Sequence, residues 1–263
     1  MARAFSRAIV RAPCASFAHG LSTANEGPPD LSLAREQHAR YCEALEACGL
    51  QVTVLAPDPQ YPDGTFVEDT AIVTGRGAVL TRPGAPSRGG EVDSVAHALA
   101  EFYGELLRIE PPGTVDGGDI CEAGDHFLIG LSARTNESGA GQLSAHLHRL
   151  GYTASVADIR NVKGLLHLKT GIAYLGDGIW LAAEEIAQSV PGCSGLHIGR
   201  LIPVVAKESY AANCVRVNDA VLVPRGYPRV LNALQDFGLT AVPLDMSEFR
   251  KMDGGLSCLS LRF

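Results

Sequence analysis

Residues 67–82 read VEDTAIVTGRGAVLTR, and this stretch decides the fold because its pattern returns along the chain. A short polar signature is followed by an apolar strand, a tight turn and a second apolar strand, which together indicate a β-hairpin. Further copies are GGDICEAGDHFLIGLS (117–132), HLKTGIAYLGDGIWLAA (167–183), ANCVRVNDAVLVP (212–224) and GGLSCLSLRF (254–263). The repeat predicts a chain built from five similar units.

One polar position recurs in every copy at a nearly fixed interval. It is occupied by Asp69, Asp119, His167, Asn213 and Cys258, which are 50, 48, 46 and 45 residues apart. Periods of this size are typical of repeat architectures. The fifth copy stops after its first strand, so we expect RAIVRA near the N-terminus to pair with SCLSLRF at the C-terminus. That pairing would close residues 1–263 into a single ring-shaped domain.

Segments with helical character separate the hairpins. Their apolar residues recur at three- and four-residue steps, and most of them stop at a glycine, a common helix-ending residue. They are LAREQHARYCEALEACG, VDSVAHALAEFYGELL, SGAGQLSAHLHRLG and YPRVLNALQDFG. Each unit should therefore run strand, strand, helix, strand, which predicts an α/β fold, a five-bladed pseudo-symmetric propeller. The rival, a doubly wound sheet, lacks support because the sequence contains no GxGxxG or GxxxxGK loop.

Composition and charge exclude several classes of function. Apolar residues make up 46% of the chain, and 22 Lys and Arg stand against 29 Asp and Glu, giving a formal charge of −7. This balance argues against nucleic-acid binding, which requires basic patches, and it suits a small cationic ligand. No apolar run approaches the roughly 18 residues that a membrane helix requires.

The cysteines and the N-terminus bear on where the protein works. The seven cysteines are odd in number and form no CxxC pair, so we expect a reduced, cytoplasmic setting and no metal site. The first 25 residues are rich in arginine and serine and lack acids, as transit peptides do. AIVRA is nevertheless a good short strand close to the start, and we favour that interpretation.

The recurring polar position changes identity from copy to copy, which a purely structural repeat does not explain. A cysteine, a histidine and carboxylates on one axis are what nucleophilic catalysis requires: the thiolate attacks, and the histidine moves protons. Cys258 taken alone could be a packing residue, and His167 taken alone a structural one. Their place in the series favours the nucleophile and the general acid and base.

Acidic residues cluster near two of the expected strand starts. Asp63, Glu68 and Asp69 form one group, and Asp116 and Asp119 form another. Acids buried near a ring axis are costly unless paired, and a planar guanidinium would relieve that cost through forked hydrogen bonds. Two arginines could hold a carboxylate at the far end of the ligand. These are Arg88 and Arg134, and the loop segments GLSTANEGPPDL and TRPGAPSRGG could form lids.

At this point the motifs resemble those of the dimethylarginine dimethylaminohydrolase family. They are FVEDTAIV, TRPGAPSRGGEVD, GTVDGGDI, GLSARTNESGA, LHLKTG, ESYAANCVRVND and RKMDGGLSCLSLRF. The likeness runs from AIVRAP to the last residue. Single motifs such as GGD are weak, but seven in order with a terminal cysteine are specific. The family belongs to the guanidino-modifying pentein superfamily, whose fold is the five-bladed propeller that the repeat predicts.

The resemblance implies catalytic roles at individual positions. Cys258 in DGGLSC matches the nucleophile, and His167 in LHLKTG matches the general acid and base. Asp116 in TVDGGD matches the acidic partner of the histidine. In FVEDT, Glu68 and Asp69 match acids that contact the substrate, with Asp69 at its guanidinium.

The resemblance also implies how the rest of the substrate is held. Asp63, Leu21 and Met252 match positions at the amino end, the last two largely through their backbone. Arg88 in GAPSR and Arg134 in SARTN match the pair that grips the α-carboxylate.

The implied reaction is hydrolysis of asymmetric dimethylarginine or monomethylarginine to citrulline and the methylated amine. The family needs no cofactor and no metal, and zinc held by Cys258 and His167 would inhibit the enzyme. The expected partner is the small-molecule substrate, with no nucleic acid and no membrane, and a homodimer is a candidate assembly.

Other functions stay open. An arginine deiminase would use a similar set of residues, but such enzymes are usually longer. An agmatine deiminase would not need two arginines for a carboxylate. A non-catalytic binder of methylarginine would be expected to lack the cysteine, the histidine or an acid, and this chain has all of them.

Overall fold

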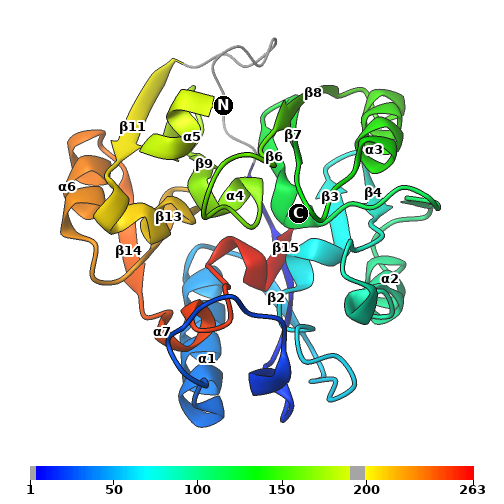
Figure 1. Ribbon diagram of the computed structural model, residues 1–263, viewed down its shortest axis with the longest axis horizontal. Coiled ribbons are helices and arrows are strands. Elements are labelled where there is room, and N and C mark those ends of the chain that lie inside the picture. Colours follow the sequence, from blue (N-terminus) through cyan, green and yellow to red (C-terminus); the bar gives the residue numbers. More distant parts are fainter. Residues whose placement is uncertain (1–3, 190–198) are drawn as a thin grey trace.

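The computed structural model describes residues 4–189 and 199–263, so Cys193 lies outside the described residues. Within these ranges the strands form five three-stranded sheets. Figure 1 shows the sheets around a common centre, with the longer helices on the periphery. The fold is a five-bladed α/β propeller, which confirms the prediction from the repeat.

Each sheet has the same internal order. Two strands pair antiparallel, as a hairpin in the first four sheets, and a third strand joins them in parallel after a crossover. The first sheet along the chain contains β3 (Ala71–Thr74), β4 (Gly77–Leu80) and β5 (Leu106–Arg108). The second contains β6 (Ile120–Ala123), β7 (His126–Leu131) and β8 (Thr153–Asp158). The third contains β9 (Ile172–Tyr174), β10 (Ile179–Ala183) and β11 (Arg200–Val204). The fourth contains β12 (Val215–Val217), β13 (Ala220–Pro224) and β14 (Thr240–Leu244).

The fifth sheet joins the two ends of the chain. It consists of β15 (Ser260–Arg262), β1 (Arg7–Arg11) and β2 (Gln51–Leu55). β1 runs antiparallel to β15, with Ile9 opposite Leu261, and parallel to β2. The segment AIVRA is therefore a strand of the ring.

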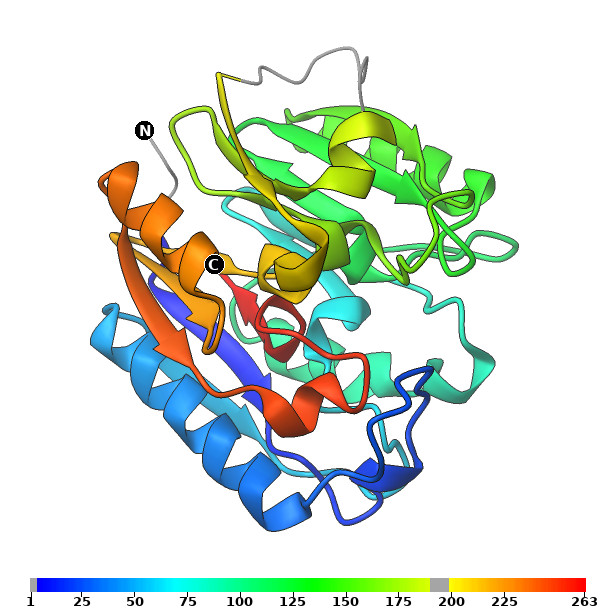
Figure 2. The same ribbon diagram turned by 60° about the vertical axis from the view of Figure 1, so that its left-hand side comes forward.

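The longer helices lie outside the sheets, whereas the short helix α4 (Leu168–Gly171) lies near the centre of the ring. The other described helices are α1 (Leu31–Ala47), α2 (Glu91–Leu99), α3 (Glu137–Arg149), α5 (Glu184–Ser189), α6 (Pro228–Asp236) and α7 (Ser247–Arg250). Figure 2, which brings the left side of Figure 1 forward, shows α1 and α6 on the outer side of their sheets. Among the described residues, no helix combines the length and the apolar character that crossing a membrane requires.

Two helices differ from the expectation. The segment 92–107 was expected to be helical throughout, but α2 ends at Leu99, and Leu106–Arg108 instead pairs with β4 as the third strand of its sheet. Pairing with a neighbouring strand outweighs the local helical pattern there. The sequence pattern also gave no sign of α5.

Burial distinguishes the strands near the axis from those at the rim. All four residues of β3 and all five of β10 are buried, whereas the outer strands β2 and β14 carry exposed residues. The hydrophobic core is divided into clusters that join neighbouring units; one contains Ile9 and Leu261 of the fifth sheet together with Val73 and Leu80 of the first. Packing between units therefore fixes the ring.

Candidate active site

A single helical turn precedes the inner strand of each unit, and the recurring polar residues lie on these turns. The polar side chains thus belong to short turns at strand entry, not to the strands themselves. Their positions are Asp69 in a 3₁₀ helix at Val67–Thr70, Asp119 in one at Gly117–Asp119, His167 at the N-cap of α4, Asn213 at the C-cap of a 3₁₀ helix at Ala206–Ala212, and Cys258 in a 3₁₀ helix at Ser257–Leu259.

His167 and Asp116 form a buried pair. Nε2 of His167 lies 3.0 Å from Oδ2 of Asp116, and the two residues are 7% and 0% exposed. Burial alone would lower the pKa of His167, but the charge of Asp69, the hydrogen bond with Asp116 and the charge of Asp119 raise it to about 9. The imidazole is therefore cationic at neutral pH and can donate a proton.

Asp116 also faces Arg134. Nη1 of Arg134 is 3.8 Å from Oδ2 of Asp116, and the backbone N–H of Gly84 donates to Oδ1 at 2.7 Å. The side chain of Arg134 keeps 19% of its surface exposed, so its guanidinium is available to a ligand. The structure thus brings Asp116 together with the histidine and with one arginine of the expected carboxylate grip.

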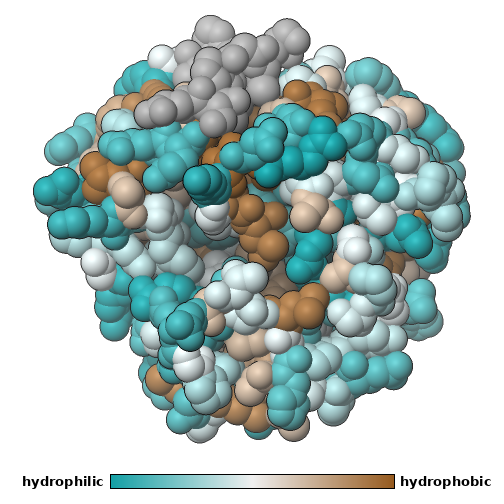
Figure 3. All heavy atoms as spheres, in the orientation of Figure 1, coloured by the Kyte–Doolittle hydropathy of each residue, from teal (hydrophilic) through white to brown (hydrophobic). Residues whose placement is uncertain are grey.

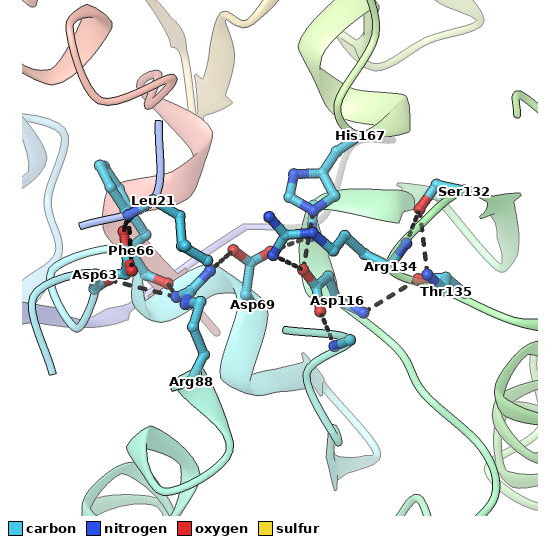
Figure 4. A network of polar contacts seen from close by, with 12 residues as sticks. Leu21, Asp63, Phe66, Asp69, Arg88, Asp116, Ser132, Arg134, Thr135 and His167 are labelled. Atoms are coloured by element: carbon cyan, nitrogen blue, oxygen red, sulfur yellow. Dashed lines mark hydrogen bonds and ion pairs between the residues drawn. The ribbon is translucent and has the colours of Figure 1, made fainter. Parts of the chain in front are cut away.

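The second arginine of that grip is engaged within the protein. Nη1 of Arg88 lies 2.5 Å from Oδ2 of Asp69, and its Nη2 lies 2.7 Å from Oε2 of Glu91. Burial works against the charged form of Asp69, but the charges of Arg88 and His167 and the hydrogen bonds from Arg88 and Gly118 together lower its pKa to about 2. Asp69, expected at the substrate's guanidinium, therefore binds a guanidinium of the protein itself. Figure 4 shows Asp69 between Arg88 on one side and His167 on the other.

Three expected residues at the amino end meet at Gly20. The backbone N–H of Leu21 donates to both carboxylate oxygens of Asp63, at 3.0 and 3.2 Å. A Cβ on Gly20 would stand 2.5 Å from Oδ1 of Asp63 and 3.1 Å from Cε of Met252. Only glycine allows this close approach, so the segment GLSTANEGPPDL is anchored to the site at its first residues.

Cys258 sits in acidic surroundings. Burial, followed by the charges of Glu68 and Asp69, raises the pKa of its thiol to about 12, while a backbone hydrogen bond from Gly255 and the charge of Lys169 act the other way. Asp69 thus contributes to the raised pKa of both Cys258 and His167.

Glu68 makes its contacts on a different side from Asp69. Its Oε1 accepts from Nζ of Lys169 at 2.6 Å, and its Oε2 accepts from Oγ of Ser257 at 2.8 Å. These three residues also line a cavity of about 170 Å³ at the end of the ring where the hairpins turn. Glu68 thus links the turn that carries the cysteine to the helix that follows the histidine.

Asp119 ties together two segments of the site. Its Oδ2 accepts from the hydroxyls of Ser132 at 2.6 Å and Thr135 at 2.7 Å, and its Oδ1 accepts from the backbone N–H of Leu168 at 3.0 Å. Burial raises the pKa of Asp119 to about 6, against the opposing effects of His167 and these hydrogen bonds. Asp119 therefore fixes the turn after His167 relative to the segment that carries Arg134.

A hollow of about 520 Å³ opens beside these groups. Thr23, Ala24 and Glu26 of the segment GLSTANEGPPDL line it, as do Asn213 and Gly255. Figure 3 shows polar side chains around the rim of this face and apolar ones toward its middle. The hollow offers a ligand a route to the cysteine turn.

One group of side chains has metal-ligand character. Ligand atoms of Asp69, Asp116 and His167 lie within 4.8 Å of one another. The two carboxylates already face cations, Arg88 in one case and the imidazole in the other. The donor set therefore fits an internal charge network better than a dedicated metal site.

Five residues to which the sequence assigned no task take part in the site. Asp119 and Asn213 stand at recurring polar positions, and Lys169 lies in the motif LHLKTG. Glu91 and Ser257 lie in the motifs TRPGAPSRGGEVD and RKMDGGLSCLSLRF. All five are Glu91, Asp119, Lys169, Asn213 and Ser257.

Comparison with known proteins shows to which family the chain belongs. It is 46% identical over 260 residues to the N(G),N(G)-dimethylarginine dimethylaminohydrolase of Pseudomonas aeruginosa, covering 98% of this chain and 100% of that protein. The chain belongs to the dimethylarginine dimethylaminohydrolase family. It is accordingly a hydrolase of carbon–nitrogen bonds, as the resemblance implied. No family model matches the chain.

Solved structures agree with this family. A cysteine-to-serine mutant of the Pseudomonas aeruginosa enzyme, complexed with citrulline, superposes with a TM-score of 0.93 at 45% identity over 99% of this chain and 100% of that one. The N-terminal domain of an arginine dihydrolase from cyanobacteria, ArgZ, has a TM-score of 0.83 at 20% identity over 97% and 96% of the two chains. This second likeness shows the fold alone.

Proposed function

We propose that the protein hydrolyses Nω-methylated arginines, asymmetric dimethylarginine and monomethylarginine, to citrulline and the methylated amine through a covalent bond to Cys258. The observation that carries the proposal is the buried pair of His167 and Asp116 in the same acidic centre as the thiol. The citrulline complex of the relative from Pseudomonas aeruginosa supports the identity of the product.

Binding of the substrate is driven by charge. The guanidinium of a methylated arginine is planar and cationic, and it is attracted to Asp69. Asp69 is held by Arg88 in the free protein, so the substrate's guanidinium has to share or replace that contact. Arg134, whose side chain is partly exposed, then holds the α-carboxylate, and Asp63 with the backbone of Leu21 and Met252 holds the amino group.

The arriving cation activates the nucleophile. The thiol is protonated in the free protein because burial and two carboxylates raise its pKa to about 12. A guanidinium beside the sulfur opposes the field of those carboxylates and lowers the pKa of the thiol, so its proton passes to solvent water while His167 stays protonated. The thiolate then attacks the guanidinium carbon and forms a tetrahedral adduct.

His167 moves the protons of the two later steps. As an imidazolium it protonates the departing dimethylamine, the carbon–nitrogen bond breaks, and a thiouronium adduct on Cys258 remains. The neutral imidazole then takes a proton from water, which attacks the same carbon. Collapse of this second adduct breaks the carbon–sulfur bond and releases citrulline. Asp116 keeps the imidazole oriented and favours its charged form throughout.

Substrate preference separates this function from its relatives. Turnover of asymmetric dimethylarginine, arginine and agmatine should be compared under the same conditions, with citrulline or its decarboxylated counterpart as the measured product. We expect the methylated substrate to be turned over most efficiently and agmatine, which lacks the carboxylate, to be the poorest. Preference for arginine would indicate a deiminase instead.

Two features of the setting are also part of the proposal. The six described cysteines are all free, which favours a reducing, cytoplasmic location. A homodimer stays a prediction, and light scattering of the purified protein would test it.

A further inference from the structure

Asn213 occupies the fourth of the recurring polar positions, and the proposed reaction gives it no task. Its side chain is buried, and its Nδ2 lies 4.0 Å from Sγ of Cys258, a residue 45 positions away in the sequence. It also lines the hollow beside the lid. Asn213 is therefore a polar group in contact with the reacting sulfur.

The orientation of this amide is fixed by its other contact. Oδ1 of Asn213 accepts a hydrogen bond from the backbone N–H of Ser257 at 2.9 Å. A backbone N–H can only donate, so the oxygen has to face Ser257, and the NH₂ group has to face the sulfur. One side chain thus holds the turn that carries Cys258 and directs a donor at its thiol.

The glycines of the motif DGGLSC make room for this arrangement. A Cβ on Gly255 would stand 2.5 Å from Cγ of Asn213, so the amide packs directly on the backbone there. The hydroxyl of Tyr210 donates to the carbonyl of Gly254 at 2.8 Å, and the N–H of Asn213 donates to the carbonyl of Tyr210 at 3.2 Å. These contacts join the asparagine and cysteine segments into one rigid unit.

A hydrogen-bond donor beside the sulfur would favour the thiolate form of Cys258. Burial, Glu68 and Asp69 all disfavour a charged sulfur, and only a few groups favour it, among them the N–H of Gly255 and the cation of Lys169. A hydrogen bond to the charged form of a group stabilises that form. A neutral amide supplies such a bond without competing for the cationic substrate.

We propose that Asn213 is a further catalytic residue, whose Nδ2–H donates a hydrogen bond to the Cys258 thiolate while its Oδ1 holds the turn that carries the sulfur. The proposal rests on the proposed function, since it concerns the same nucleophile. No proton is transferred to or from the amide. The hydrogen bond strengthens when the thiol loses its proton and weakens when the carbon–sulfur bond forms.

Two substitutions separate the two tasks of the amide. Asn213→Asp keeps an oxygen for Ser257 but places a negative charge where the donor was. Asn213→Ser removes the NH₂ group and leaves a shorter hydroxyl, which can still accept from Ser257 but is farther from the sulfur. The measurement is the rate of alkylation of Cys258 by iodoacetamide between pH 7 and 9, without substrate, located by peptide mass. We expect the aspartate variant to react at least about tenfold more slowly than the wild type, because a like charge raises the thiol pKa by roughly one unit or more. The serine variant should be slowed by a smaller factor.

Controls keep the outcome decisive. Asn232→Asp adds the same charge on the exposed face of α6 and should leave the alkylation rate unchanged. Urea unfolding confirms that each variant is folded. Wild-type rates in both folded variants, or loss of folding in both, would overturn the inference. Alkylation needs no substrate, so it is independent of the proposed function, which would fail separately if the wild-type protein left dimethylarginine intact.

Discussion

At the scale of single residues, one set of carboxylates holds the thiol and the imidazole in complementary protonation states. Burial, Glu68 and Asp69 raise the pKa of Cys258, which keeps the thiol neutral. Asp69, with Asp116 and Asp119, also raises the pKa of His167 against the effect of burial, which keeps the imidazole charged. A bound guanidinium reverses both effects, because it adds a positive charge at the same point. The substrate thus produces a nucleophile and a stronger acid in one event, and the free enzyme stays unreactive.

Substitution of the histidine's partner tests this arrangement. Asp116→Asn removes a charge and a hydrogen-bond acceptor that both raise the pKa of His167, so that pKa should fall from about 9 by roughly one unit or more. Titration of the imidazole by NMR measures it directly, and turnover above pH 8 should fall as the charged fraction decreases. Asp125→Asn, in an exposed turn, is the matched control. An unchanged titration in Asp116→Asn would show that the pair does not set the charge of the histidine.

At the scale of elements, the sequence predicts the hairpins well and the contacts between them poorly. The apolar runs and tight turns of β3–β4 and β12–β13 are local signals, and they appear where expected. The end of α2 and the strand β5 were missed because pairing with β4 is a long-range contact that no local pattern encodes.

The same distinction holds for the site. His167 and Cys258 could be selected from the repeat, and the acids and the two arginines from their clustering and charge. Leu21 and Met252 came only from the resemblance to the family. The pairing of Arg88 with Asp69 and Glu91 could not be anticipated, since it depends on how a lid segment packs against a turn from another part of the chain. Glu68 likewise meets Lys169 and Ser257 through the fold of three separate units.

The link between α4 and the Arg134 segment gives a prediction at this scale. In Asp119→Asn an amide replaces an acceptor of three hydrogen bonds, and its NH₂ group has to face a donor. We expect the free energy of unfolding to fall by about 1–3 kcal/mol, measured by urea denaturation. Turnover should fall with it, because His167 loses its anchor through Leu168. Full stability and full turnover would show that Asp119 does not join these elements.

At the scale of the whole molecule, the ring brings residues that recur at a fixed interval in the sequence close together in space. Residues about 45 to 50 positions apart meet at one centre because each unit presents the turn before its inner strand to the axis. Equivalent positions are free to diverge in chemistry because the sheets and the clusters between them maintain the fold. The last strand has to pair with the first for the cysteine turn to complete the set.

Because the charged His167 is buried among carboxylates only in the folded ring, the free energy of unfolding depends on pH. The pKa of His167 is raised from 6.5 to about 9 by folding, so the stabilisation is fully present below pH 6.5 and is lost as the pH rises through 9. The free energy of unfolding should fall by up to roughly 3 kcal/mol across this window. Urea denaturation at pH 6 and pH 9 measures the difference, and His167→Gln should reduce it. An equal difference in that variant would assign the pH dependence to other groups.

The most direct test of the central claim is to follow the nucleophile during turnover. The protein is incubated with asymmetric dimethylarginine, citrulline is measured over time, and samples quenched in acid are examined by peptide mass for an adduct on Cys258. We predict citrulline release with a substrate-derived adduct on that cysteine alone, and neither product nor adduct in Cys258→Ser. Citrulline formation at the wild-type rate by Cys258→Ser, or an adduct on a different cysteine, would contradict the account.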